Sequence, residues 1–329
     1  MSKKLTMALV GVGRIGVTHL RALMDNENVE LKAIVEPNEP VGRKYAEQCG
    51  LDYYKSVSEL KDRPDITAVD ICVPEEYHLS TAIAAAEAGK HIMIEKPIAK
   101  TYEEGMKMIE VCKEKGVRLM VAHTCRSMMP YRLLREQIGK GNAIGELCEV
   151  SIRRYGPRAT MDYVKGRVTI GFYIAIHDLD AVMWITGHKI TEVQAYKIDK
   201  LNAYGEDGFD LAFRFDNGAS GTMNMSWFLP AGYPGSVCEI DFLGDKGMVR
   251  SDPYVSASTL YNEKAVPNSA AAGVLEGKMF GAFKDQLDHF AQCVTDGSEF
   301  RSSGEDVVYS VKVVEAILRS MESGKPEAV

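Results

Sequence analysis

A glycine-rich turn near the start of the chain constrains its fold more than any other feature. The letters GVGRIG begin at Gly11, directly after the apolar run Leu5 to Val10, and lead into the helix-like run Arg14 to Met24. In such a turn Gly11 permits the tight bend, Gly13 lets a pyrophosphate approach the backbone, and Gly16 lets helix and strand pack closely. The N–H groups and the positive dipole of the helix N-terminus suit the phosphates. The order strand, turn, helix predicts a dinucleotide-binding domain.

The rest of the first third repeats the alternation of strand and helix. The expected strands are Leu31 to Val35, Ala68 to Val73, His91 to Ile94 and Arg118 to Ala122, and the expected helices are Asn38 to Cys49, Tyr77 to Ala88 and Tyr102 to Lys115. This alternation is typical of βαβ units, which form a parallel sheet covered by helices on both faces. We therefore expect a doubly wound α/β domain over residues 1–122.

The pattern changes after about residue 123, where strand-like runs follow one another across turns. The expected strands are Glu149 to Arg154, Thr191 to Ile198, Asp210 to Phe215, Ala219 to Trp227, Val237 to Leu243 and Met248 to Arg250. The turn Asp216-Asn217-Gly218 is a hairpin signal. An irregular stretch to Ile170 and helices over Phe172 to Ile185, Lys278 to Val294 and Glu305 to Ser320 complete the pattern. We expect an α+β domain over residues 123–329 with an antiparallel sheet.

Composition excludes several classes of protein. The net charge of −7 offers no broad basic surface for a nucleic-acid backbone. No apolar run reaches the ~18 residues of a membrane-spanning helix. The apolar start is interrupted at Gly11, Gly13 and Arg14 and no small-residue cleavage site follows, so we expect mature sequence of a cytoplasmic protein. None of the seven cysteines forms a C-x-x-C pair, which predicts reduced, buried thiols and no metal site.

An acidic residue ends the second expected strand. Glu36 follows Gly16 by about 20 residues, where a carboxylate accepts hydrogen bonds from the adenosine ribose and repels a 2′-phosphate. The residue favours NAD over NADP; the alternative is an exposed strand-end glutamate. Arg43 and Lys44 would help a 2′-phosphate only if their loop folds back.

A second motif, Glu95-Lys96-Pro97, follows the strand His91 to Ile94. Ligands of parallel sheets bind outside the carboxyl ends of strands, so Lys96 is expected to project toward the nicotinamide end of the cleft. Its ammonium group could donate a hydrogen bond to a substrate oxygen. Taken alone, Lys96 is more simply a solvated surface lysine.

Together these motifs resemble the glucose–fructose oxidoreductase / inositol dehydrogenase (Gfo/Idh/MocA) family. The likeness covers nearly the whole chain. Its quoted segments are the glycine turn, Val73-Pro74-Glu75-Glu76-Tyr77-His78, Ala88-Gly89-Lys90-His91, Glu95-Lys96-Pro97, His123-Thr124-Cys125-Arg126, Ile176-His177-Asp178-Leu179-Asp180, Ser226-Trp227 and Ser323-Gly324-Lys325-Pro326. The E-K-P motif followed by the I-H-D stretch is the most specific part.

The resemblance implies an NAD(P)-dependent oxidoreductase acting on a sugar, an inositol or a sugar derivative. It implies a Rossmann domain followed by a domain with an open, mostly antiparallel sheet, with the substrate between the domains. The open sheet face often packs on another subunit, so a homodimer or homotetramer is expected. The implied cofactor residues are Gly11, Gly13, Arg14, Ile15, Gly16, Glu36, Pro74, His78, Glu95 and Lys96.

Several side chains are candidates for chemistry on the substrate. By resemblance Lys96 is the E-K-P lysine and His177 the I-H-D histidine, whose imidazole can take a hydroxyl proton near neutral pH. The alternative for His177 is a core histidine. His123 and Arg126 are expected to face the same cleft, although Arg126 could equally bind an inter-domain carboxylate. We interpret His19 as a packing residue on the first helix.

The chain departs from the family at one position. Many members have an aspartate four residues before the histidine, and here that position is Tyr173. If the stretch is helical, Tyr173 and His177 share a face. We expect a Lys96–Tyr173–His177 arrangement with His177 as base and Tyr173 orienting the substrate; the alternative is that Tyr173 fills space in the core.

Three functions compete at this point. The first is hydride transfer between a hydroxyl-bearing carbon and NAD. The second is redox-neutral glycoside cleavage, in which tightly held NAD oxidises the sugar transiently and is then re-reduced. The third is a non-catalytic sensor of NAD and a sugar, which the presence of both Lys96 and His177 disfavours.

Overall fold

The computed structural model describes residues 4–201, 204–233, 235–254, 273–275 and 278–329. The chain divides into two compact units. Unit 1 comprises Met1–Ser127 and Ala272–Tyr309, and unit 2 comprises Met128–Ala271 and Ser310–Val329. We describe each unit by itself.

Unit 1 is built on a six-stranded sheet in the order β3-β2-β1-β4-β5-β6, with every strand pair parallel. Its strands are β1 (Leu5–Val10), β2 (Val29–Val35), β3 (Asp52–Tyr54), β4 (Ala68–Ile71), β5 (His91–Glu95) and β6 (Leu119–Ala122). β4 and β6 are buried along their whole length, as strands covered on both faces must be. The strand order reverses between β1 and β4, which is where ligands bind in doubly wound folds. The prediction of a doubly wound parallel sheet is confirmed.

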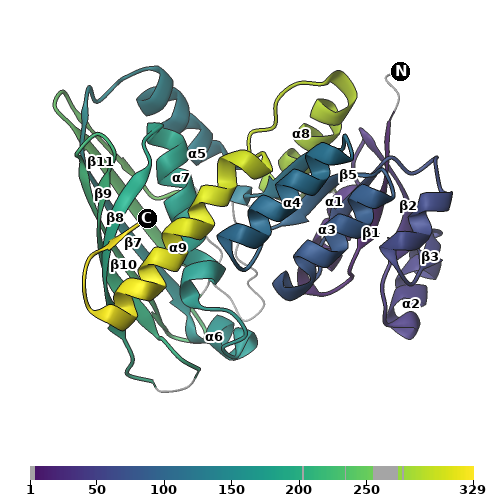
Figure 1. Ribbon diagram of the computed structural model, residues 1–329, viewed down its shortest axis with the longest axis horizontal. Coiled ribbons are helices and arrows are strands. Elements are labelled where there is room, and N and C mark those ends of the chain that lie inside the picture. The colour runs from purple at the N-terminus through teal and green to yellow at the C-terminus, as the bar shows by residue number, and fades with distance from the viewer. Residues whose placement is uncertain (1–3, 202–203, 234, 255–272, 276–277) are drawn as a thin grey trace. The chain divides into compact units, whose positions relative to one another are not determined.

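Helices surround this sheet, as Figure 1 shows in purple and blue. They are α1 (Arg14–Met24), α2 (Glu39–Cys49), α3 (His78–Glu87) and α4 (Tyr102–Glu114), with short 3₁₀ turns η1 (Val57–Asp62), η2 (Glu75–Tyr77) and η3 (Thr124–Ser127). Unit 1 also contains the small strands β13 (Gly273–Leu275) and β14 (Lys278–Phe280) and the helix α8 (Ala282–Asp296).

The return of residues 272–309 to unit 1 differs from the expected division at residue 122/123. Helix α8 packs on α1, and its side chains Leu287 and Phe290 are fully buried in the same apolar cluster as Met7 and Leu9 of β1. The apolar face of α8 therefore completes the core under the parallel sheet. Sequence order alone placed it in the second domain.

Unit 2 is built on a seven-stranded sheet in the order β12-β11-β7-β10-β9-β8-β15. Its strands are β7 (Leu147–Pro157), β8 (Ile190–Ile198), β9 (Gly208–Phe215), β10 (Ser220–Leu229), β11 (Val237–Gly244), β12 (Met248–Ser251) and β15 (Glu327–Ala328). β7 and β10 pair in parallel and the other neighbours are antiparallel. Burial alternates along β9, as expected for a sheet with one covered face. The expected mostly antiparallel sheet is confirmed.

The helices of unit 2 are α5 (Met129–Leu134), the π-helical η4 (Arg135–Lys140), α6 (Arg158–Val164), the π-helical η5 (Gly171–Ala175) and α7 (Ile176–Thr186). The last long helix, α9 (Gly304–Ser323), begins in the residues of unit 1 and ends in those of unit 2.

Three local expectations differ from the structure. The stretch expected to be irregular contains α6, and the helix expected over Phe172 to Ile185 starts as a π-helix. The helix expected from Lys278 begins only at Ala282, because Lys278–Phe280 pairs as strand β14. Gly281, at φ +98°, turns the chain between this strand and helix α8. Most of the segment between Tyr254 and Lys278 lies outside the described residues.

None of the helices in the described ranges combines the length and apolarity needed to cross a membrane. All seven cysteines are free thiols. Five are buried, as expected, but Cys49 is half-buried and Cys148 is exposed.

Candidate functional site

The glycine turn has the shape that a dinucleotide requires. Gly11 has φ +89°, and a Cβ added there would lie 2.8 Å from the Cys72 carbonyl oxygen. A Cβ on Gly16 would lie 2.1 Å from the Gly11 carbonyl oxygen, whereas one on Gly13 would meet nothing within 4 Å. Two glycines are therefore fixed by the turn, and Gly13 leaves open space over the backbone. This cradle fits a pyrophosphate.

The N-terminus of α1 faces that space. Gly13 is its N-cap residue, no side chain caps this described helix by a hydrogen bond, and its first turn holds no acidic residue. Arg14 is exposed and Ile15 is half-buried. The N–H groups of the first turn, together with the positive end of the helix dipole, are thus suited to an anion.

The Glu36 carboxylate reaches the glycine turn. Its Oε2 accepts a hydrogen bond from the Val12 N–H at 3.2 Å, and its Oε1 accepts one from the Asn38 N–H at 3.0 Å. The Tyr53 hydroxyl donates to the Glu36 carbonyl oxygen at 2.9 Å, a contact that the sequence did not reveal. The carboxylate is half-buried and lies beside the glycine turn, a position that suits a ribose-binding acid.

Arg43 is held away from the role of a phosphate ligand. Its Nε lies 2.7 Å from Glu39 Oε1, and its guanidinium carbon lies 4.9 Å from the centre of the Tyr53 ring. The nearby positive charge is therefore matched by Glu39, one helical turn earlier.

His78 is a buried positioning group. Pro74 precedes the turn η2 that leads to it. The ring of His78 is 1% exposed, with Nδ1 2.8 Å from the Pro97 carbonyl oxygen and Nε2 3.1 Å from the Val73 carbonyl oxygen. Burial lowers the pKa of His78, which favours the neutral ring. These contacts tie the loop after β4 to the loop that carries Lys96, so a role in shaping the site is better supported than contact with the cofactor.

Lys96 lies directly after β5, half-buried, and its peptide bond to Pro97 is cis. The preceding Glu95 is 7% exposed, and its Oε2 accepts a hydrogen bond from the Lys96 N–H at 3.2 Å. The Glu95 carboxylate thus faces inward and holds the backbone of Lys96.

A buried ionic cluster lies beneath the motif. The imidazole of His19 on α1 is fully buried, with Nδ1 2.8 Å from Asp70 Oδ2 and Nε2 3.1 Å from Glu95 Oε1. Burial alone would lower the pKa of His19, but Asp70, with a smaller contribution from Cys72, raises it well above the usual value. Burial would likewise raise the pKa of Glu95, yet the contact with His19 keeps it lowered. His19 is therefore more than the packing residue that the sequence suggested.

His123 and Arg126 are buried in unit 1, at 2% and 4% exposure. Arg126 Nη1 donates to the Arg301 carbonyl oxygen at 2.7 Å, which joins η3 to the segment before α9. This partner is neither the substrate oxygen nor the inter-domain carboxylate expected for Arg126, and it gives the side chain a structural link within unit 1.

In unit 2, Tyr173 and His177 are the two half-buried side chains of a stretch, residues 170–180, that is otherwise buried. Tyr173 belongs to the π-helix η5 and His177 to the first turn of α7. The Tyr173 ring lies 5.9 Å from the ring of Trp227, centre to centre. Both side chains are therefore partly accessible, and π-helical turns are frequent at functional sites.

The residue after His177 anchors its helix. Asp178 is fully buried; its Oδ2 lies 3.5 Å from Arg154 Nε, and its Oδ1 accepts a hydrogen bond from the Tyr131 hydroxyl at 3.3 Å. Burial raises the pKa of Asp178, partly offset by Arg154. This anchor was missed, although a carboxylate on an apolar helix in the I-H-D stretch was a signal for it.

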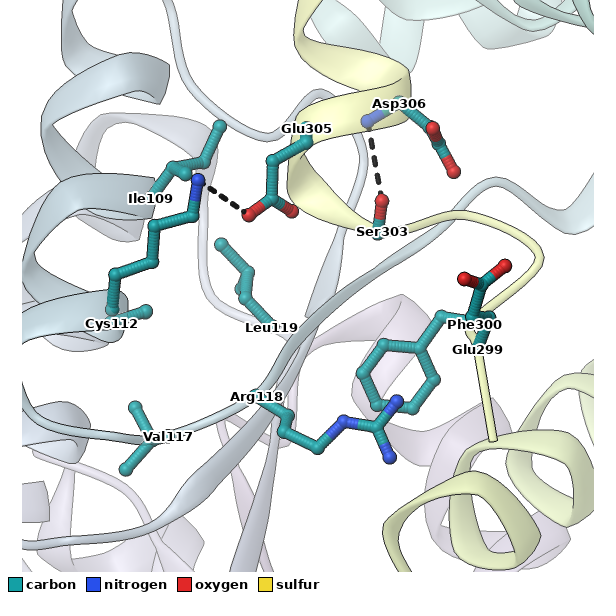
Figure 2. Close-up of a pocket in the computed structure, with 11 residues that line it drawn as sticks. Ile109, Cys112, Val117, Arg118, Leu119, Glu299, Phe300, Ser303, Glu305 and Asp306 are labelled. Atoms are coloured by element: carbon teal, nitrogen blue, oxygen red, sulfur yellow. Dashed lines mark hydrogen bonds and ion pairs between the residues drawn. The ribbon is translucent and has the colours of Figure 1, made fainter. Parts of the chain in front are cut away.

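A separate pocket of about 390 Å³ lies in unit 1 beside α4 and the segment before α9. Figure 2 shows its lining, in which Arg118 lies near Phe300. Its two cations are already matched, since Lys113 Nζ lies 3.1 Å from Glu305 Oε1 and Arg118 donates to backbone carbonyls. Glycine-turn and E-K-P residues do not line this pocket, and we assign it no role in the chemistry.

The parallel sheet, the glycine cradle and the acid at Glu36 define the class of dinucleotide-binding Rossmann proteins. Residues 5–123 match the oxidoreductase family with an NAD-binding Rossmann fold, and residues 135–329 match the C-terminal alpha/beta domain of that family. The chain belongs to this Gfo/Idh/MocA oxidoreductase family, and NAD is its cofactor.

Relatives and solved structures agree with the family. The chain is 27% identical to a myo-inositol 2-dehydrogenase of Thermotoga maritima, covering 96% of both chains. It is 25% identical to a scyllo-inositol 2-dehydrogenase (NAD(+)) of Bacillus subtilis, covering 99% of this chain and 96% of the relative. The crystal structure of a probable dehydrogenase from Thermotoga maritima superposes with a TM-score of 0.84 at 26% identity, covering 98% of both chains. The protein is therefore a dehydrogenase.

Proposed function

We propose that the protein transfers a hydride between NAD and a hydroxyl-bearing carbon of an inositol, a sugar or a sugar derivative. Relatives of nearly full-length coverage that are named inositol dehydrogenases support this substrate class. The observation that carries the proposal is the presence of an E-K-P lysine after β5 together with a half-buried histidine on α7. Neither redox-neutral glycoside cleavage nor a sensor role is favoured by these relatives.

Each candidate residue has a chemical task in this proposal. Bound NAD supplies the hydride acceptor or donor. The glycine turn binds the pyrophosphate, and Glu36 binds the ribose hydroxyls. His177 accepts the hydroxyl proton as the alcohol is oxidised. The Lys96 ammonium donates a hydrogen bond to the same oxygen as it becomes a carbonyl. Tyr173 donates a hydrogen bond that orients the substrate.

The substrate class is tested with a panel of inositols, aldoses and glycosides, each assayed with NAD and with NADP. We expect NADH formation with at least one inositol or aldose, and reduction of the matching keto compound in the reverse direction. Turnover of a glycoside without net NADH, by protein that purifies with NAD bound, would instead support the redox-neutral alternative.

The role of Lys96 is tested by Lys96→Ala beside Lys100→Ala, an exposed lysine four residues later. Lys96→Ala should lose most turnover while the Kd for NAD changes less than ~3-fold, because the pyrophosphate contacts lie elsewhere. Lys100→Ala should retain turnover. Equal activity in the two variants would reduce Lys96 to a surface residue.

We also propose a cytoplasmic location and a homodimer or homotetramer that forms through the sheet of unit 2. The free thiols support the first, since disulfides form in oxidising compartments. The second rests on the family resemblance and is tested by light scattering after size-exclusion chromatography. A single species of 36.3 kDa would contradict it.

A further inference from the structure

One face of the parallel sheet carries acidic side chains toward α1. Asp70 on β4 pairs in register with Met93 on β5, so their side chains point to the same face. Glu95 lies two residues beyond Met93 and returns to that face. Helix α1 brings His19 against the same two strands. Three ionisable groups from three elements therefore meet in the interior of unit 1.

The ring of His19 lies between two carboxylates. Its Nδ1 is 2.8 Å from Asp70 and its Nε2 is 3.1 Å from Glu95. A neutral imidazole has one N–H and would turn a lone pair toward one of these oxygens. The imidazolium form places its positive charge beside both carboxylates. Its Nδ1–H donates a hydrogen bond to Asp70, whereas Nε2 and Glu95 Oε1 are at ion-pair distance without the alignment of a hydrogen bond. The arrangement thus places one positive charge between two negative charges at a site from which water is excluded.

The two carboxylate oxygens of Glu95 contact different groups. Oε1 contacts the His19 ring, and Oε2 accepts the Lys96 N–H at 3.2 Å. The carboxylate cannot rotate without losing a buried contact, which is costly in the interior. A chain of contacts thus runs from His19 on α1 and Asp70 on β4 through Glu95 to the backbone N–H of Lys96.

We propose that His19 and Asp70 are positioning residues that act through Glu95 to hold the backbone of Lys96 in its reactive place. This inference rests on the proposed role of Lys96. Neither His19 nor Asp70 needs to touch the substrate or NAD. Their effect is to keep a lysine that follows the end of a strand from changing its backbone position during turnover.

A metal ion is the competing explanation for this cluster. Ligand atoms of His19, Asp70 and Cys72 lie within 4.8 Å of one another. However, both ring nitrogens of His19 already lie within 3.1 Å of carboxylate oxygens, so neither lone pair is directed at a common point shared with Cys72. The Nδ1 of His19 is at hydrogen-bond distance from Asp70. The contacts therefore favour an ion pair over a metal site.

The experiment compares Glu95→Ala, Glu95→Gln and His19→Phe in the full chain, with Lys90→Met as control. Lys90 is also a buried cation of unit 1, but its Nζ donates to the Arg63 and Ile66 carbonyl oxygens at 2.7 Å and does not contact Glu95. We expect kcat to fall at least ~10-fold in Glu95→Ala and His19→Phe, with the Kd for NAD changed less than ~3-fold. Glu95→Gln keeps an oxygen for the Lys96 N–H, so it should turn over at least ~3-fold faster than Glu95→Ala.

A second readout does not depend on activity. Amide hydrogen exchange at Lys96 should become at least ~10-fold faster in Glu95→Ala, and should stay within ~2-fold in Lys90→Met at matched temperature below unfolding. If His19→Phe does not fold, the two Glu95 variants decide the matter. Unchanged exchange and kcat in Glu95→Ala would overturn the inference, as would Glu95→Gln as slow as Glu95→Ala. One zinc ion per chain in the purified protein, lost in His19→Phe, would also overturn it.

The two proposals fail in different ways. Lys96→Ala with full turnover would remove the proposed role of Lys96, and faster exchange in Glu95→Ala would then leave only a structural contact. Lys96→Ala without turnover, combined with normal exchange and kcat in Glu95→Ala, would refute the positioning role alone.

Discussion

At the scale of single residues, the Glu36 carboxylate is the group that we expect to select between NAD and NADP. Its carboxylate is held beside the turn by the Val12 and Asn38 N–H groups, and the nearest arginine on α2 is paired with Glu39. A 2′-phosphate would therefore meet the negative charge of Glu36, while the guanidinium of Arg43 is already paired with Glu39. The preference for NAD follows from this placement.

We predict that NAD binds at least ~10-fold more tightly than NADP, or ~1.4 kcal/mol. Glu36→Ala should narrow that gap, because it removes both the ribose acceptor and the repulsion. Glu47→Ala, which removes an exposed carboxylate from the helix α2 that follows Glu36, should leave the difference in affinity in place. Fluorescence titrations measure the Kd values for NAD and NADP in each variant. Equal or tighter NADP binding by the unmodified protein would refute the prediction.

At Tyr173, the role of the hydroxyl group can be tested separately from the packing of the aromatic ring. Its ring contacts Trp227, and Trp227 in turn lies so close to Gly156 that a Cβ there would come within 2.7 Å of the indole. Removing only the hydroxyl keeps this aromatic packing. Tyr173→Phe should lower kcat/KM ~10-fold or more with little change in Tm. If the kinetics are unchanged, Tyr173 only fills space.

At the scale of elements, α1 joins the cofactor site to the sheet interior. Its N-terminus faces the glycine turn, and one turn later its His19 holds Asp70 and Glu95. The same helix therefore serves phosphate binding at its end and charge pairing on its buried face. The titratable groups that face His19 are the carboxylates of Asp70 on β4 and Glu95 on β5 and the protonated thiol of Cys72, which directly follows β4.

This arrangement predicts a loss of stability at alkaline pH. The pKa of His19 is raised in the folded chain, so its stabilising contribution is complete below the unfolded value of ~6.5 and is lost as pH rises through the folded value. Between those values the free energy of unfolding should fall with pH by up to ~1.4 kcal/mol per pH unit more than in His19→Gln. Urea unfolding from pH 7 upward measures the difference. Parallel pH profiles for both proteins would contradict the prediction.

At the scale of the whole molecule, each unit takes residues from distant parts of the chain. Unit 1 needs α8, whose Leu287 and Phe290 are fully buried against the strands and helices of the first third. Burial of each such side chain contributes ~1.5–3 kcal/mol. That is a large part of the ~5–15 kcal/mol that stabilises a typical domain.

A fragment of residues 1–127 should therefore lack a cooperative thermal transition. The same fragment joined by a flexible linker to residues 278–309 should regain one, because the apolar cluster is complete again. Circular dichroism on heating distinguishes the two. A cooperative transition of equal midpoint in both would show that α8 is dispensable for unit 1.

The sequence by itself determined the parallel sheet, the glycine cradle, the acid at Glu36 and the position of Lys96 after β5, because each depends on residues that are close along the chain. Only the tertiary structure decided the partners of His19, the inward direction of Glu95 and the return of α8 to unit 1. His19 and Asp70 are 51 residues apart, and they meet only because strand register and helix packing bring one sheet face under α1. The π-helix under Tyr173 is likewise set by packing in unit 2, since the apolar pattern of that stretch suits an α-helix equally well.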